Sequence, residues 1–180
     1  RMSEWPGPYN GVIEMQDQTF VVRYEIDLHN PVNRQKNREW IALELNKSDS
    51  LFSFGTYPEG YPNQSEMHRS QYFSAFGISN RSGDRFATFY YFFDALKIFD
   101  DEGTELFARY IDSKDAGSPE AFFADRPENQ AGFAPRWADD DYIFTQRNVY
   151  ENEELTQVYL EVWNWQAELL YTAPLDHAIS

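Results

Sequence analysis

Alternation of apolar and polar residues is the clearest pattern in this chain. Over residues 20–28 every second side chain is apolar, and most of the intervening positions are charged. A period of two predicts a half-buried β-strand. The pattern resumes over residues 40–45, after a polar stretch that is typical of an exposed loop.

Two further pairs of apolar runs predict β-hairpins. Residues 71–79 and 85–93 flank a short polar loop in which Gly83 can supply the positive φ that hairpin turns need. Residues 95–99 and 104–111 flank a second, acidic loop that ends in Gly103. Hairpins that follow one another along the chain predict a meander.

The segment from 112 to 141 breaks the alternation, because Gly and Pro recur in it among acidic residues. We expect it to be irregular, with a short helix over 119–124, and long irregular segments often act as lids or partner contacts. Aromatic anchors dominate protein interfaces. On this hypothesis the chain is a structural or assembly subunit, and its partner contacts are the aromatic residues of this segment: Phe122, Phe123, Phe133 and Trp137.

Alternation returns over residues 142–147 and 155–165. The chain of 180 residues suits one domain, and its high aromatic content favours pleated structure. The sequence therefore predicts a single all-β domain, an antiparallel sandwich, such as a jelly roll, or a barrel of roughly eight to ten strands.

The last of these strands carries the candidate ligand-binding residues. Tyr159, Glu161, Trp163 and Trp165 share one face of it, where flat rings could stack on sugar rings and the carboxylate could accept hydroxyl hydrogen bonds. The alternative is that these aromatic residues pack in the core of one sheet. The principal prediction is a non-catalytic binding domain for a glycan or another polyhydroxylated ligand.

A third hypothesis is an enzyme on a β scaffold. Glu25, Asp27 and His29 fall on one face of the strand predicted over 20–28, where they could act as acid, base and orienting partner in glycan cleavage by a hydrolase or lyase. The alternative is a solvated outer face. An apolar barrel interior of the kind that cyclases and isomerases use is equally compatible with the alternation.

Charge excludes several partners. The chain has 30 Asp and Glu against 15 Lys and Arg, a formal net charge of −15, which disfavours nucleic acid and anionic lipid surfaces. No apolar run is long enough to predict membrane insertion. The acid-rich, Lys-poor composition favours a marine or halophilic source or an ordinary acidic secreted domain, and three Asn-x-Ser sites favour export.

The same composition limits cofactor chemistry. There is no Cys, so disulfides and thiolate metal sites are excluded, and no phosphate-binding or dinucleotide glycine motif occurs. We expect no cofactor apart from a candidate Ca²⁺ site. Its oxygen ligands would come from the acidic run Asp139, Asp140 and Asp141.

Overall fold

The structure is a computed structural model, and it describes residues 12–16, 19–23, 38–44, 50–56, 75–91, 95–110, 129–151 and 154–176. These residues form twelve antiparallel strands in three sheets of four, without a helix, which confirms the predicted all-β antiparallel class. The strands are more numerous than expected, and none of the three sheets closes on itself. No helix capable of spanning a bilayer occurs within these ranges.

The N-terminal sheet is a meander of four short strands: β1 (Val12–Glu14), β2 (Thr19–Arg23), β3 (Trp40–Glu44) and β4 (Ser50–Phe54). Strands β2 and β3 fall where alternation predicts strands. The continuation of the first predicted strand, residues 24–28, lies outside the described residues.

The middle sheet confirms both predicted hairpins. Its strands are β5 (Ala75–Ser79), β6 (Arg85–Tyr90), β7 (Ala95–Asp100) and β8 (Glu105–Tyr110). Gly83 and Gly103 have φ of 74° and 79° in the two turns, a backbone conformation that glycine adopts at no steric cost.

The C-terminal sheet has the order β12-β11-β10-β9. Two of its strands were not expected: β9 (Asn129–Ala138), which lies within the segment predicted to be irregular, and β12 (Leu169–Leu175). Strand β9 accommodates Pro135 because it is an edge strand of its sheet and Pro135 lies at a register shift, where its missing N–H costs little. Residues 112–128, with the predicted helix, lie outside the described residues. The longest strand is β11 (Glu154–Asn164), and β10 (Tyr142–Glu151) is as long as β9.

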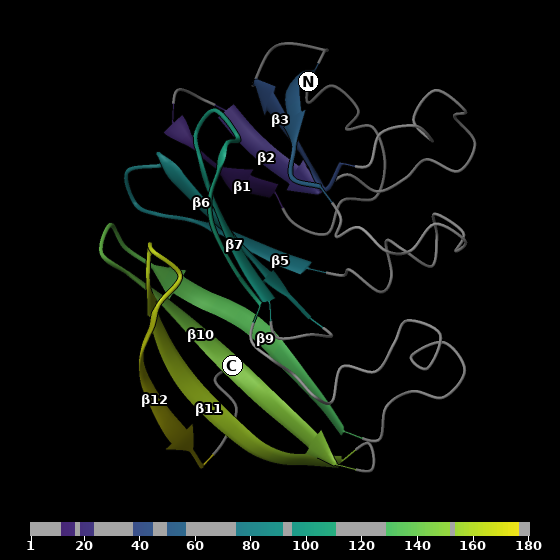
Figure 1. The fold of residues 1–180 in the computed structure, drawn as a ribbon, viewed down its shortest axis with the longest axis vertical. Coiled ribbons are helices and arrows are strands. Elements are labelled where there is room, and N and C mark those ends of the chain that lie inside the picture. The colour runs from purple at the N-terminus through teal and green to yellow at the C-terminus, as the bar shows by residue number, and fades with distance from the viewer. Residues whose placement is uncertain are drawn as a thin grey trace, which may run out of the picture.

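The three sheets lie in sequence order, with β5–β8 between the other two (Figure 1). Side chains of β6 alternate between two cores, which explains why the whole of this strand beyond Arg85 is buried. Phe86 and Tyr90 point into the N-terminal core, formed with the first sheet, whereas Ala87 and Phe89 point into the C-terminal core, formed with the third.

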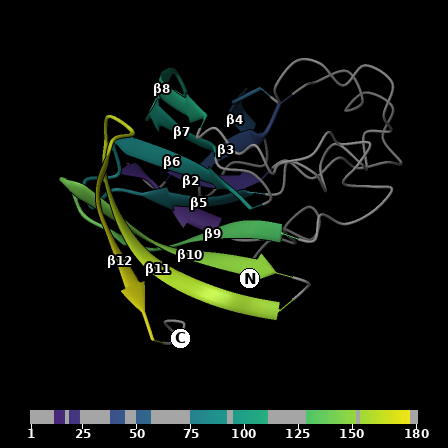
Figure 2. The ribbon, with the colours of Figure 1, turned by 60° about the horizontal axis from the view of Figure 1, so that its bottom comes forward.

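Strand β9 lies beside β5, so the C-terminal sheet meets the middle sheet along this edge (Figures 1 and 2). The opposite edge of the C-terminal sheet is β12. One face of the C-terminal sheet covers the C-terminal core, and the other faces away from it. We call these the inner face and the outer face.

Candidate functional site

The two tryptophans of the predicted ligand platform are buried, Trp163 on the inner face of β11 and Trp165 in the turn that follows this strand. Trp163 is 0% exposed and Trp165 is 1% exposed, and both belong to the C-terminal core. The Trp165 indole N–H donates to the carbonyl of Asp139 at 2.9 Å, and that of Trp163 donates to the Thr145 hydroxyl at 3.3 Å. The alternative that these rings pack in the core is therefore confirmed, and the exposed platform is wrong. The residues do share one face, but that face packs against the middle sheet.

The other two predicted platform residues lie on the same inner face. Glu161 is buried, and its Oε1 lies 3.5 Å from Nη1 of Arg147, whose guanidinium also lies 5.6 Å from the Phe133 ring centroid. Tyr159 is half-buried and donates its hydroxyl hydrogen bond to Gln157. The Glu161 carboxylate on the inner face is thus held in an ion pair with Arg147 beside the C-terminal core.

The outer face exposes a different set of aromatic residues. Trp137 pairs with Phe144 across β9 and β10, Phe144 pairs with Val162, and Val162 pairs with Tyr171 on β12. These four side chains, here called the outer row, cross all four strands of the sheet. They point away from the C-terminal core because Phe144 and Val162 alternate with the core residues Ile143 and Trp163.

Both ends of the outer row are open to solvent. Trp137 is 54% exposed and Tyr171 is 59% exposed, and the Trp137 and Phe144 rings lie 5.1 Å apart between centroids. With strands about 4.8 Å apart, the row extends over roughly 14 Å. Two of the three aromatic side chains of the row are thus open to solvent, and their rings present flat apolar faces.

A cation lies next to the outer row. Arg136 is the extra residue at the register shift of β9, and its exposed side chain donates from Nη2 to Oε1 of Gln146 at 3.0 Å. Gln146 follows Phe144 by two residues on β10, so the guanidinium lies about 7 Å along the strands from the outer row.

The acceptor of this hydrogen bond is itself held in place. Gln146 is 1% exposed and donates from Nε2 to Oδ1 of Asn148 at 2.6 Å, and Asn148 donates to the Tyr150 hydroxyl at 3.4 Å. The last member of this chain of hydrogen bonds, Tyr150, also interacts with Tyr91. Burial raises the pKa of the Tyr91 phenol, and Tyr150 raises that pKa further. Among the described residues, Arg136 is therefore oriented by a buried amide with a fixed partner, and not by an ion pair.

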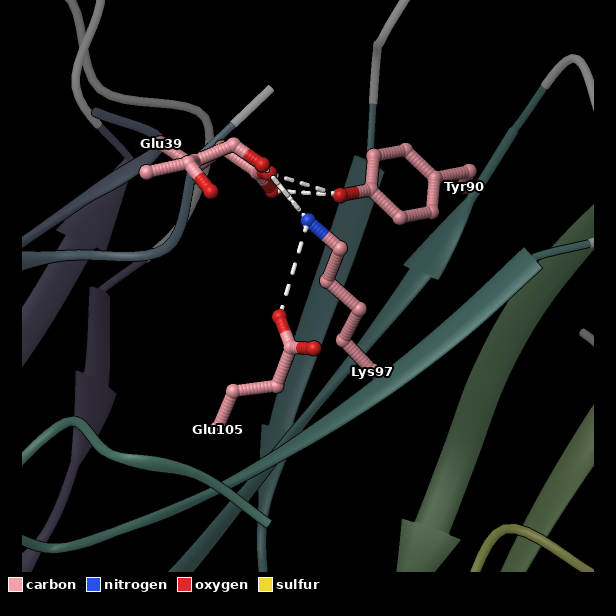
Figure 3. Close-up of polar contacts among 5 residues, drawn as sticks. Glu39, Tyr90, Lys97 and Glu105 are labelled. Atoms are coloured by element: carbon pink, nitrogen blue, oxygen red, sulfur yellow. Dashed lines mark hydrogen bonds and ion pairs between the residues drawn. The ribbon is translucent and has the colours of Figure 1, made fainter. Parts of the chain in front are cut away.

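A second polar cluster lies between the N-terminal and middle sheets (Figure 3). Lys97 Nζ lies 2.8 Å from Glu39 Oε1 and donates to the Thr56 carbonyl at 2.6 Å, and the Tyr90 hydroxyl lies 2.8 and 2.6 Å from the two Glu39 oxygens. Glu105 lies 3.9 Å from Nζ and is the member nearest solvent. Since Glu39, Tyr90 and Lys97 are buried, the centre of this cluster joins two layers away from solvent, and the cluster reaches the surface at Glu105.

The acidic run at 139–141 forms the turn between β9 and β10. Asp139 Oδ1 accepts from the backbone N–H groups of Asp141 and Tyr142, and Asp140 accepts from the backbone N–H and hydroxyl of Ser82. These hydrogen bonds lower the pKa of Asp140. Within the described ranges no group of three or more His, Asp or Glu is arranged to hold a metal ion, and Ca²⁺ binding here stays a prediction.

The remaining predicted residues divide into three groups. The catalytic candidates Glu25, Asp27 and His29 lie outside the described residues, as do Phe122 and Phe123. The prediction that Phe133 is an exposed partner contact is wrong, because Phe133 is buried in the C-terminal core. Trp137 is exposed as expected, but it lies on a regular strand.

Sequence reasoning missed Arg136, Gln146, Tyr171 and Lys97 as residues of interest. Lys97 had a signal, because a lysine flanked on both sides by apolar residues, Ala95-Leu96 and Ile98-Phe99, indicates a strand buried on both faces. The outer row had none, since it depends on the pairing of four strands. No family model, curated protein or solved structure matches this chain.

Proposed function

We propose that this chain is a non-catalytic binding domain for a glycan, with the outer row as its ligand site. The observation that carries the proposal is the continuous row of Trp137, Phe144, Val162 and Tyr171 across the C-terminal sheet, exposed at both ends. The proposal keeps the ligand class expected from the sequence and moves the site from one face of the sheet to the other.

The chemistry of the outer row favours sugars over wholly apolar ligands. Flat rings offer apolar area to the C–H faces of a sugar, while polar groups beside them satisfy its hydroxyls. Arg136 supplies such donors at the margin of the row. The row is longer than one sugar ring, so an oligosaccharide fits it better than a monosaccharide.

The test is binding to an oligosaccharide array followed by calorimetry with Trp137→Ala and Tyr171→Ala. Covering an aromatic side chain contributes about 1.5–3 kcal/mol, so each variant should weaken binding about tenfold or more. Phe107→Ala is the matched control, because Phe107 is an exposed aromatic residue on β8 of the middle sheet. Unchanged affinity in both outer-row variants would place the site elsewhere.

A second candidate function, an assembly subunit, is favoured by β12. This edge strand carries no charged residue from Leu169 to Leu175 and exposes Leu169, Leu170 and Tyr171. Apolar strand edges are places where chains pair with one another. Light scattering over a range of concentrations tests this, and Leu170→Lys should dissociate any assembly that uses the edge.

A further inference from the structure

Arg136 has an unusual environment for an exposed cation in this chain. Acidic residues outnumber basic ones two to one, 30 against 15, yet no carboxylate of the described residues pairs with Arg136. An exposed arginine without a carboxylate partner ordinarily samples many rotamers. This one is held at 3.0 Å by Gln146, whose amide is buried and bonded to Asn148.

The guanidinium keeps most of its hydrogen-bonding capacity. It carries five N–H donors in a planar fork, and one contact, to Gln146 Oε1, is made within the described residues. An oriented fork of this kind matches a carboxylate, which it can bind through two parallel hydrogen bonds.

Among the residues that the structure describes, the surrounding outer face carries no competing anion. Side chains that share this face on β10, β11 and β12 are neutral: Phe144, Gln146, Asn148, Tyr150, Val158, Leu160, Val162, Tyr171, Ala173 and Leu175. The nearest acidic run is the turn beyond Trp137, where Asp139 and Asp140 already accept hydrogen bonds from turn amides and from Ser82.

We infer that the ligand of the outer row carries an isolated carboxylate that Arg136 binds, as in a mostly neutral oligosaccharide bearing a uronic acid. This inference rests on the proposed function. One guanidinium matches one acidic group, whereas the net charge of −15 repels a ligand charged at every sugar. Because Arg136 lies about 7 Å to one side of the row, the acidic group projects sideways from the stacked chain.

The test uses oligosaccharides in matched pairs, each made of a neutral chain and the same chain bearing one glucuronate. The pairs are built on xylotetraose and on the equivalent galactan and mannan chains. Heparin serves as a densely charged probe. The acidic member of the bound pair should bind about tenfold more tightly, as expected for charge-assisted hydrogen bonds. Arg136→Gln should remove that preference, because it lowers the affinity for the acidic member about tenfold more than the affinity for the neutral member, which loses at most a hydroxyl contact. Arg136→Lys should restore only part of it, because the fork is lost.

Arg38→Gln is the matched control. It removes the same charge from an exposed residue next to the N-terminal sheet, and it should leave the preference intact. Three results would overturn this inference: equal binding of both members of a pair, an equal loss of affinity for both in Arg136→Gln, or tighter binding of heparin than of the acidic oligosaccharide. If Trp137→Ala still weakens binding in such a case, the proposed function stands and only the inference fails. If no glycan binds, or if neither Trp137→Ala nor Tyr171→Ala weakens binding, the proposed function fails and the inference fails with it.

Discussion

The two cores on either side of the middle sheet handle positive charge in different ways. In the N-terminal core Lys97 lies inside, 2.8 Å from the buried Glu39 carboxylate. In the C-terminal core Arg109 and Arg147 lie over ring faces, 5.8 Å from the Trp163 centroid and 5.6 Å from that of Phe133. Both cores are packed with aromatic rings, but the N-terminal core also encloses an ion pair between two buried groups. The cations of the C-terminal core lie at its margin, where Arg147 also pairs with Glu161.

This difference predicts different responses to substitution. A buried ion pair contributes little net stability but is costly to break, because the partner that remains keeps its charge without compensation. A packed aromatic residue contributes through area and contacts, and its removal leaves a cavity. Two measurements test the comparison, beginning with the larger expected effect, and a third uses the exposed turn at Asp140 as a reference outside both cores.

Trp163→Ala should lower the free energy of unfolding by about 3–5 kcal/mol, the usual cost of emptying a buried tryptophan site. Trp163 contacts both Phe89 and Phe133, so its loss affects the centre of the C-terminal core. Urea unfolding measures the change. Trp137→Ala on the outer face is the control, and it should change stability by about 0.5 kcal/mol or less. Equal effects in the two variants would contradict the assignment of inner and outer faces.

Lys97→Met should lower the free energy of unfolding by about 3 kcal/mol. This is the lower end of the usual cost of breaking a buried ion pair, because Tyr90 still donates to Glu39. Adding Glu39→Gln to the same chain should recover much of that loss, because the uncompensated carboxylate is then gone. A double-mutant cycle in urea separates these contributions. If the double variant is less stable than Lys97→Met alone, the cluster does not behave as a buried ion pair.

Asp140→Asn should have the smallest effect on the free energy of unfolding, and that effect should depend on pH. Hydrogen bonds from Ser82 hold the pKa of Asp140 below its ordinary value of about 3.9. A lowered pKa stabilises the folded state above the unfolded pKa, and this stabilisation is lost as pH falls through the folded pKa. Thermal unfolding from neutral to acidic pH should therefore show the two proteins converging in acid. A constant difference would mean that the carboxylate charge is not involved.

Local features of the fold were predictable from the sequence. The two hairpins of the middle sheet were evident because Gly83 and Gly103 stand between alternating runs, and both have the expected positive φ. The alternation in β11 correctly grouped Trp163 with Trp165. Alternation defines two faces of a strand, but it does not say which one meets another sheet.

The features that the sequence did not predict depend on contacts between distant parts of the chain. Pro135 and Gly132 argued against a strand, yet β9 tolerates the proline at a register shift on a sheet edge. The outer row requires the register of three strand pairs, and the Lys97 cluster requires the packing of two sheets. Apart from the apolar residues that flank Lys97 and indicate its burial, none of these arrangements has a local sequence signal.

The middle sheet also has a consequence for how the chain folds. Each sheet is a meander of consecutive strands, so its hairpins can form from nearby residues. However, β6 and β7 need a covering layer on both sides, and the C-terminal layer is synthesised last. A nascent chain that ends after β8 would present Phe89, Leu96 and Ile98 to water. During synthesis, this face is the one that a chaperone would have to shield until β10 and β11 emerge.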